Sequence, residues 1–205
     1  MGGFIAILKP MGISHLHNIH ISILYYLAAA GLGLKLFFSE ELKAHVFHFK
    51  TQTFLYLITS LLFIFITVGL GKLVTLPTSH EEYLLYKQFY YPLMYWKSSF
   101  SKLADLIFQQ FLIVCLVLFL KHESKNNYTT ITIFTFSFFL LHVPLFFFFG
   151  FAGIVFILPS LFAGVIFSFC IVRFQWGIFY SMCIHQLYYV ILALILRSVP
   201  FEYLL

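Results

Sequence analysis

Long apolar runs alternate with short polar stretches along most of the chain. Each of six runs is long enough for a helix that crosses a bilayer, which needs about 20 mostly apolar residues. Helices are expected because backbone groups in lipid lack water partners, and the runs lack the alternation of barrel strands. The pattern predicts an all-α, polytopic membrane bundle forming a single membrane domain over residues 1–205. The predicted spans lie near residues 18–38, 52–76, 103–120, 129–149, 151–172 and 175–197.

The segment 78–100 differs from these runs. It combines several charged residues with Pro92 and a high density of Tyr and Trp side chains. Such amphipathic aromatic sequences are typical of the membrane–water interface. We therefore expect an interfacial or re-entrant helix here rather than a span.

Composition supports a membrane protein and narrows its partners. Apolar residues make up 62% of the chain and charged residues only 9%, too few to cover a soluble domain of this size. The net charge of +5 comes from scattered basic residues, so lipids rather than nucleic acid are the expected partners. The cell membrane is the expected location.

The orientation in the membrane does not follow from the positive-inside rule. Six spans place five basic residues on each side. One side collects Lys9, Lys87, Lys97, Lys102 and Arg197, and the other collects Lys43, Lys50, Lys121, Lys125 and Arg173.

Three of the predicted spans carry costly polar residues at membrane depth. Asp105 is the only acid inside a span, and it shares a helix face with Gln109, four residues later. His142 and His185 lie well inside two further spans, and Gln110 lies about 100° round the helix from Gln109. Intramembrane ionisable groups usually face the bundle interior and pair. One convergent site is therefore predicted.

A structural explanation of the same residues stays open. Asp105 follows Ser101 and Lys102 closely, and it can lie at the headgroup boundary as a first-turn charge. A single histidine within a span often only makes a hydrogen bond between helices.

The two histidines also carry a family resemblance. Phe138-x-x-x-His142 is followed by a glycine-containing span that ends in Arg173, and then by a span with His185. This order resembles the CPBP intramembrane proteases, which include the CAAX prenyl endopeptidases and the bacterial Abi proteins. The resemblance covers residues 103–197. It implies that the first histidine activates water with a glutamate, and that the second binds the oxyanion with an asparagine.

Two of the family's motifs are altered in this chain. The motif EExxxR is replaced by Gln109 and Gln110, with Val114 at the arginine position. Tyr189 stands where the asparagine that follows His185 is expected. A neutral glutamine cannot act as the base, so the resemblance leaves the base unassigned.

Three explanations for the missing base follow. Asp105, one turn before Gln109, can supply the carboxylate. Glu81 and Glu82 echo the glutamate pair, but they fit capping-box patterns with Thr78 and Ser79. The chain can also be a catalytically silent relative, like the scaffold subunit of gamma-secretase, which is similar to this superfamily.

The leading hypothesis is an intramembrane endopeptidase acting on a membrane-embedded or lipidated peptide. In it, Asp105 and His142 activate water, His185 stabilises the oxyanion, Gln109 positions water or substrate, and Tyr189 donates its phenol. A divalent metal held by His142, His185 and Asp105 is a weaker option.

The alternative hypothesis is a non-enzymatic scaffold or immunity-type membrane protein, in which the same residues tie helices together. Haem ligation by His142 and His185 is the least favoured possibility.

Overall fold

A computed structural model describes residues 9–13, 18–37, 46–73 and 96–198. These residues form helices and the turns between them, and no strand occurs in the described ranges. Five stretches are long and apolar enough to cross a membrane, and a shorter apolar helix covers His20–Gly33. The predicted all-α, polytopic architecture is confirmed.

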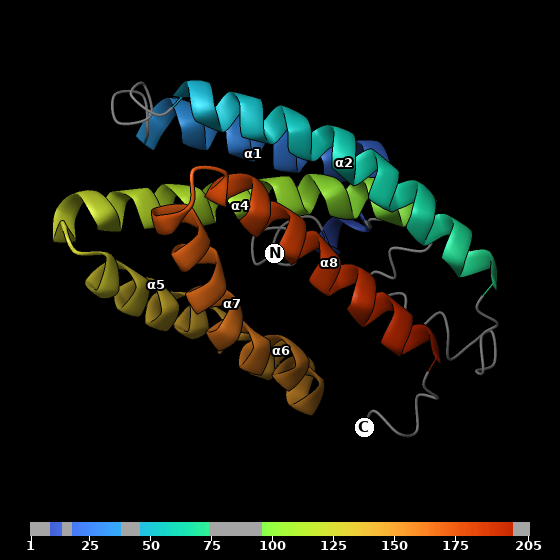
Figure 1. The fold of residues 1–205 in the computed structure, drawn as a ribbon. Coiled ribbons are helices and arrows are strands. Elements are labelled where there is room, and N and C mark those ends of the chain that lie inside the picture. The colour runs from blue at the N-terminus through green and yellow to red at the C-terminus, as the bar shows by residue number, and fades with distance from the viewer. Residues whose placement is uncertain (1–8, 14–17, 38–45, 74–95, 199–205) are drawn as a thin grey trace.

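Each predicted span overlaps one long helix (Figure 1). Most of the predicted interfacial segment 78–100 lies outside the described residues. Its last five residues, 96–100, belong to a helix that begins earlier than the predicted residue 103. The helices are α1 (Ile19–Phe37), α2 (Val46–Leu73), α4 (Trp96–Ser124), α5 (Asn127–His142), α6 (Leu145–Phe149), α7 (Ile154–Arg173) and α8 (Gly177–Ser198), and 3-10 turns cover Lys9–Met11 and Gly150–Gly153.

The predicted span 129–149 is broken after its fourth turn. Its first helix, α5, starts behind Asn126, whose side chain accepts a hydrogen bond from the Tyr128 N–H at 2.9 Å. The helix ends at His142 because Pro144 has no N–H to continue the ladder. The short helix α6 follows, and Gly150 ends it with a positive φ of 57°. The break places His142 at the end of a helix, within the apolar stretch Asn127–Phe147.

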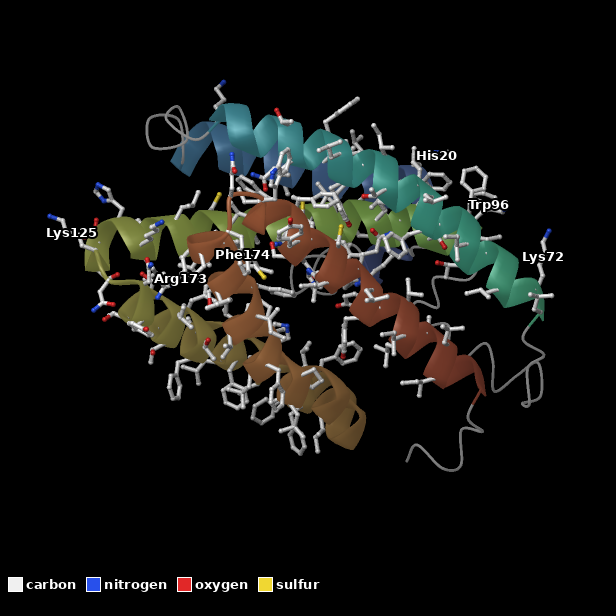
Figure 2. The ribbon with its side chains drawn as sticks, viewed as in Figure 1. His20, Lys72, Trp96, Lys125, Arg173 and Phe174 are labelled. Atoms are coloured by element: carbon white, nitrogen blue, oxygen red, sulfur yellow. The ribbon has the colours of Figure 1, made fainter. Side chains whose placement is uncertain are left out.

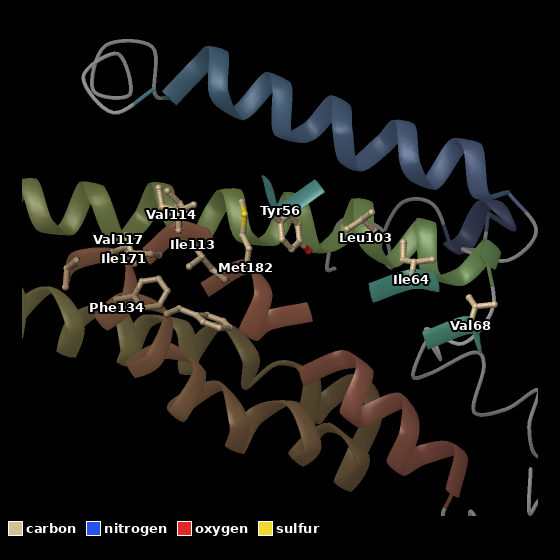
Figure 3. Close-up of a cluster of buried hydrophobic side chains, with 13 residues drawn as sticks. Tyr56, Ile64, Val68, Leu103, Ile113, Val114, Val117, Phe134, Ile171 and Met182 are labelled. Atoms are coloured by element: carbon tan, nitrogen blue, oxygen red, sulfur yellow. The ribbon is translucent and has the colours of Figure 1, made fainter. Parts of the chain in front are cut away.

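Helix α4 is the centre of the bundle. It contacts α1 and α2 on one side and α5, α7 and α8 on the others (Figure 1). Its buried apolar side chains meet those of α2, α5, α7 and α8 in the largest core cluster (Figure 3). Labelled members of this cluster include Tyr56, Leu103, Val114, Phe134 and Met182. The central position explains why 56% of an 18-residue apolar window within Ser99–Ser124 is buried.

Basic side chains mark the two ends of the bundle. Lys72 lies at one end, and Lys125 and Arg173 lie at the other (Figure 2). The guanidinium carbon of Arg173 lies 5.6 Å from the ring centroid of Tyr128, a cation–π contact that joins the end of α7 to the start of α5. Both ends thus carry charges suited to a headgroup region.

A buried amide fixes the start of α8. The Gln52 side chain donates to the Gln175 carbonyl at 2.8 Å and accepts from the Phe179 N–H at 3.0 Å. The first N–H groups of a helix lack intrahelical partners, so this contact satisfies one of them from α2. Gly177 is required in the same turn, because a Cβ there would collide with the Cys170 carbonyl.

Replacing Gln52 should destabilise the bundle. Gln52→Ala removes two hydrogen bonds and leaves two backbone groups without them, so we expect the free energy of unfolding to fall by about 1–3 kcal/mol. Denaturant unfolding in detergent micelles measures this. Gln175→Ala is the matched control, because that exposed residue contributes only its backbone carbonyl. Equal losses for the two variants would contradict the assigned role.

Candidate functional site

Buried polar side chains gather where α4 and α8 meet. The two helices run in opposite directions (Figure 1), so the early turns of α4 face the later turns of α8. All of these polar residues are at most 6% exposed. They are Lys102, Asp105 and Gln110 on α4, and Ser181, His185 and Gln186 on α8.

The first group in this interface is a buried ion pair. The Lys102 Nζ lies 2.6 Å from Asp105 Oδ2, and each side chain is 1% exposed. The same ammonium lies 3.9 Å from the ring centroid of Tyr189 on α8. The predicted span begins at residue 103 and leaves Lys102 outside it, whereas the apolar stretch Ser99–Ser124 of the structure includes Lys102. Because α4 starts at Trp96, Lys102 falls within the helix, three residues from Asp105.

The second group links an amide, a hydroxyl and an imidazole. The Gln110 Nε2 donates to Ser181 Oγ at 2.6 Å, and Gln110 Oε1 lies 3.2 Å from His185 Nδ1. The Ser181 hydroxyl in turn donates to the Ile178 carbonyl at 2.9 Å. The two ends of the Gln110 amide therefore both contact α8.

The amide that meets His185 is Gln110, not Gln109. The sequence pairs Gln109 with Asp105 on one face, but the hydrogen bonds to Ser181 and His185 come from Gln110, about 100° further round the helix. The Gln109 side chain interacts with the Asp105 carboxyl group, but the buried atoms Asp105 Oδ1 and Gln109 Nε2 do not reach ordinary hydrogen-bond geometry with any described residue. These two atoms are thus polar groups with hydrogen-bonding capacity left over, which is uncommon in a protein interior.

His142 stays apart from the α4–α8 polar groups. Its Nδ1 lies 2.7 Å from the Phe138 carbonyl in the preceding turn of α5. Within the described ranges, no hydrogen bond joins it to Asp105 or His185. Because α5 ends at this residue, the ring folds back on its own helix. The single cluster predicted from Asp105, Gln109, His142 and His185 therefore does not form as one hydrogen-bonded group.

Aromatic rings connect the two histidines instead. The ring centroids of His142 and Phe138 lie 4.5 Å apart, and those of Phe138 and Phe167 lie 6.1 Å apart. Phe167 continues to His185 at 5.1 Å, and His185 to Tyr189 at 5.5 Å. The row crosses from α5 through α7 to α8. Tyr189 ends it between His185 and the Lys102 ammonium.

The described residues contain no metal centre. Within them, no group of three or more His, Cys, Asp or Glu side chains is arranged to hold a metal ion. The metal option with His142, His185 and Asp105 therefore has no support in this geometry.

Lys102 and Ser181 belong to the site but were not predicted from the sequence. The signal for Lys102 was its spacing of three from Asp105, which makes a same-face pair once both residues are placed in one helix. Ser181 had a weaker signal, its position one turn before His185 on a face of α8.

Comparisons with known proteins do not add a family. No family model, curated protein or solved structure matches this chain. The resemblance of residues 103–197 to the CPBP proteases stays a prediction.

Breaking the buried ion pair should be costly. Lys102→Met leaves the Asp105 carboxylate buried without its partner, and Asp105→Leu does the converse, so we expect each to lower the free energy of unfolding by about 3–5 kcal/mol. The double variant Lys102→Met/Asp105→Leu should recover most of this loss, because no uncompensated charge remains. Denaturant unfolding of the wild type, the two single variants and the double variant in detergent micelles measures the coupling energy between Lys102 and Asp105.

The exposed Lys121, on the same helix, supplies the control. Lys121→Met should change stability by less than about 0.5 kcal/mol. A double variant as unstable as the sum of the two single variants would show that the residues act independently.

Proposed function

We propose that the protein is an intramembrane endopeptidase that hydrolyses a peptide bond of a membrane-embedded or lipidated substrate. The observation that carries the proposal is the hydrogen bonding of two imidazole rings. His142 and His185 each have Nδ1 next to an oxygen acceptor and no hydrogen bond from Nε2 to any described residue. Each ring therefore keeps one nitrogen for chemistry.

The surroundings of His142 decide which nitrogen is basic. A backbone carbonyl can only accept a hydrogen bond, so the Phe138 carbonyl requires a hydrogen on His142 Nδ1. In the neutral ring the lone pair then lies on Nε2. An imidazole nitrogen in this state takes a proton from water as a general base.

The hydrolysis then balances without a cofactor. Water gives a proton to an imidazole Nε2, and its oxygen attacks the carbonyl carbon of the scissile bond. The C–N bond breaks, and the imidazolium returns the proton to the leaving amine. We assign the developing oxyanion to the Gln109 amide, because its buried Nε2 interacts with the Asp105 carboxyl group without forming an ordinary hydrogen bond to a described residue.

The proposal departs from the carboxylate base expected from the sequence. Asp105 is held by Lys102 and makes no hydrogen bond to either described imidazole. The proton transfers are therefore assigned to the histidines, and Asp105 is assigned to the ion pair. The resemblance supports a hydrolytic site at Phe138, His142 and His185, since these are the positions that keep the family's residue types.

A specific observation favours a second function, a membrane scaffold without catalysis. Every charge described at the α4–α8 interface is compensated within the pair Lys102–Asp105, and the neutral Gln110 meets His185. Such an interface ties two helices together through polar contacts, which is sufficient for a structural role. It predicts stable partner binding and no peptide cleavage.

A cleavage assay tests the peptidase proposal. Protein reconstituted in liposomes is incubated with membrane-spanning peptides and with prenylated C-terminal peptides, and products are identified by mass spectrometry. We expect the wild type to cleave, and His142→Ala and His185→Ala to slow cleavage by about 10²-fold or more, the usual contribution of general acid–base catalysis. His122→Ala is the matched control, because that ring is 72% exposed at the end of α4.

The ion-pair double variant separates the possible bases. Lys102→Met/Asp105→Leu lacks the carboxylate, and it should keep activity if the imidazoles carry the proton. Loss of cleavage in this folded variant would indicate that Asp105, and not an imidazole, is the general base. Absence of product from the wild type with every peptide, together with lower stability of the histidine variants, would favour the scaffold.

A further inference from the structure

A chain of hydrogen bonds leads from the backbone of α8 through α4 to His185. It begins at the Ile178 carbonyl, which accepts from Ser181 Oγ at 2.9 Å. Ser181 Oγ lies 2.6 Å from Gln110 Nε2, and Gln110 Oε1 lies 3.2 Å from His185 Nδ1. All three side chains are at most 6% exposed, so water does not compete for these contacts.

Donor and acceptor roles along this chain follow from one fixed end. The Ile178 carbonyl can only accept, so the single hydroxyl hydrogen of Ser181 is directed to it. Ser181 Oγ must then accept from Gln110, which presents its NH₂ group to α8 at this point. The Gln110 carbonyl oxygen is left for His185 and can only accept. His185 Nδ1 must therefore carry a hydrogen.

The reverse arrangement makes fewer hydrogen bonds. With the amide turned over, Ser181 would donate to Gln110 Oε1, and Gln110 Nε2 would donate to His185 Nδ1. The Ser181 hydroxyl would then have no hydrogen left for the Ile178 carbonyl. This leaves two side-chain hydrogen bonds instead of three in a buried site, where each lost bond is costly.

We infer that Gln110 and Ser181 are positioning residues that hold His185 with its hydrogen on Nδ1 and its lone pair on Nε2. The rings of Phe167 and Tyr189, at 5.1 Å and 5.5 Å, limit reorientation of the imidazole. In its resting state His185 is thus a proton acceptor. It has no Nε2 hydrogen to give to an oxyanion, which is the role implied by the family resemblance.

The catalytic meaning of this assignment rests on the proposed peptidase function. In that setting, His185 accepts the proton of the attacking water, and it donates to the leaving amine only after protonation. Gln110 and Ser181 touch neither water nor substrate in this scheme. They act through the imidazole alone.

Nitrogen-15 NMR of the full-length protein tests the inference directly. Histidine ring nitrogens are labelled, the protein is held in micelles at a pH where His185 is neutral, and His185 is assigned by difference from His185→Asn. A ring nitrogen without hydrogen resonates far downfield of one that carries it. We expect His185 to show hydrogen on Nδ1 and none on Nε2. Hydrogen on Nε2 in the wild type would overturn the inference.

Three substitutions separate positioning from packing. Gln110→Met removes the acceptor and should reduce the Nδ1-protonated population of His185 at least twofold, and Ser181→Ala should act in the same direction by freeing the amide to turn over. Gln110→Glu retains an acceptor for Nδ1–H and should restore the wild-type signal. An unchanged population in a folded Gln110→Met variant would also overturn the inference.

The same spectra contain an internal control. His142, assigned by difference from His142→Asn, should keep its Nδ1 hydrogen in all three variants, because its acceptor is a backbone carbonyl. The wild-type spectrum alone shows which nitrogen of His185 carries the hydrogen, so this result does not depend on whether Gln110→Met, Ser181→Ala or Gln110→Glu folds. A Nδ1-protonated His185 in a protein that cleaves no peptide retains the positioning roles and removes the peptidase function. Cleavage by a protein whose His185 carries its hydrogen on Nε2 retains the peptidase function and removes the positioning roles of Gln110 and Ser181.

Discussion

The contact between α4 and α8 sets the rest of the structure, because polar side chains inside a lipid-exposed bundle must find partners within the protein. The antiparallel register brings Lys102 of α4 to Tyr189 of α8, and Gln110 to Ser181 and His185 two turns away. A shift of one residue in either helix would turn these groups away from each other. The Gln52 amide, reaching from α2, fixes where α8 begins, and it therefore also fixes this register.

The positions of the helices along the chain were largely predictable, because they follow from the lengths of the apolar runs. Two boundaries were not. Hydropathy predicts a helix only where apolar residues follow one another. It therefore predicts a start at residue 103, although Trp96–Ser124 is one continuous helix. Helix α5 ends just before Pro144, inside an apolar run. Hydropathy does not indicate this boundary, and only the missing N–H of the proline predicts it. The early start of α4 places Lys102 inside the helix, and the break before Pro144 places His142 at the end of α5.

The burial of the candidate site's ionisable residues was predictable, but its full membership and its pairing were not. Asp105 and His185 are buried, as expected for ionisable groups at membrane depth. Which neighbour each one meets depends on helix rotation, and a spacing pattern fixes rotation only within one helix. Gln109 and Gln110 are adjacent in sequence, yet only Gln110 spans the gap to α8. His142 is the opposite case, since its partner is its own helix and not the predicted cluster.

An amide at position 110 suits this interface in a way that a carboxylate does not. It donates at one end and accepts at the other, so one neutral side chain satisfies both Ser181 and His185 without a second buried charge. A carboxylate there would only accept, and it would lie on the same helix as the Asp105 charge, which already uses Lys102 as its partner. The family that the sequence resembles has glutamates at these positions, and in the proposed peptidase the basic group is instead the imidazole that the Gln110 amide orients. The proposed chemistry therefore depends on the position of one hydrogen on His185.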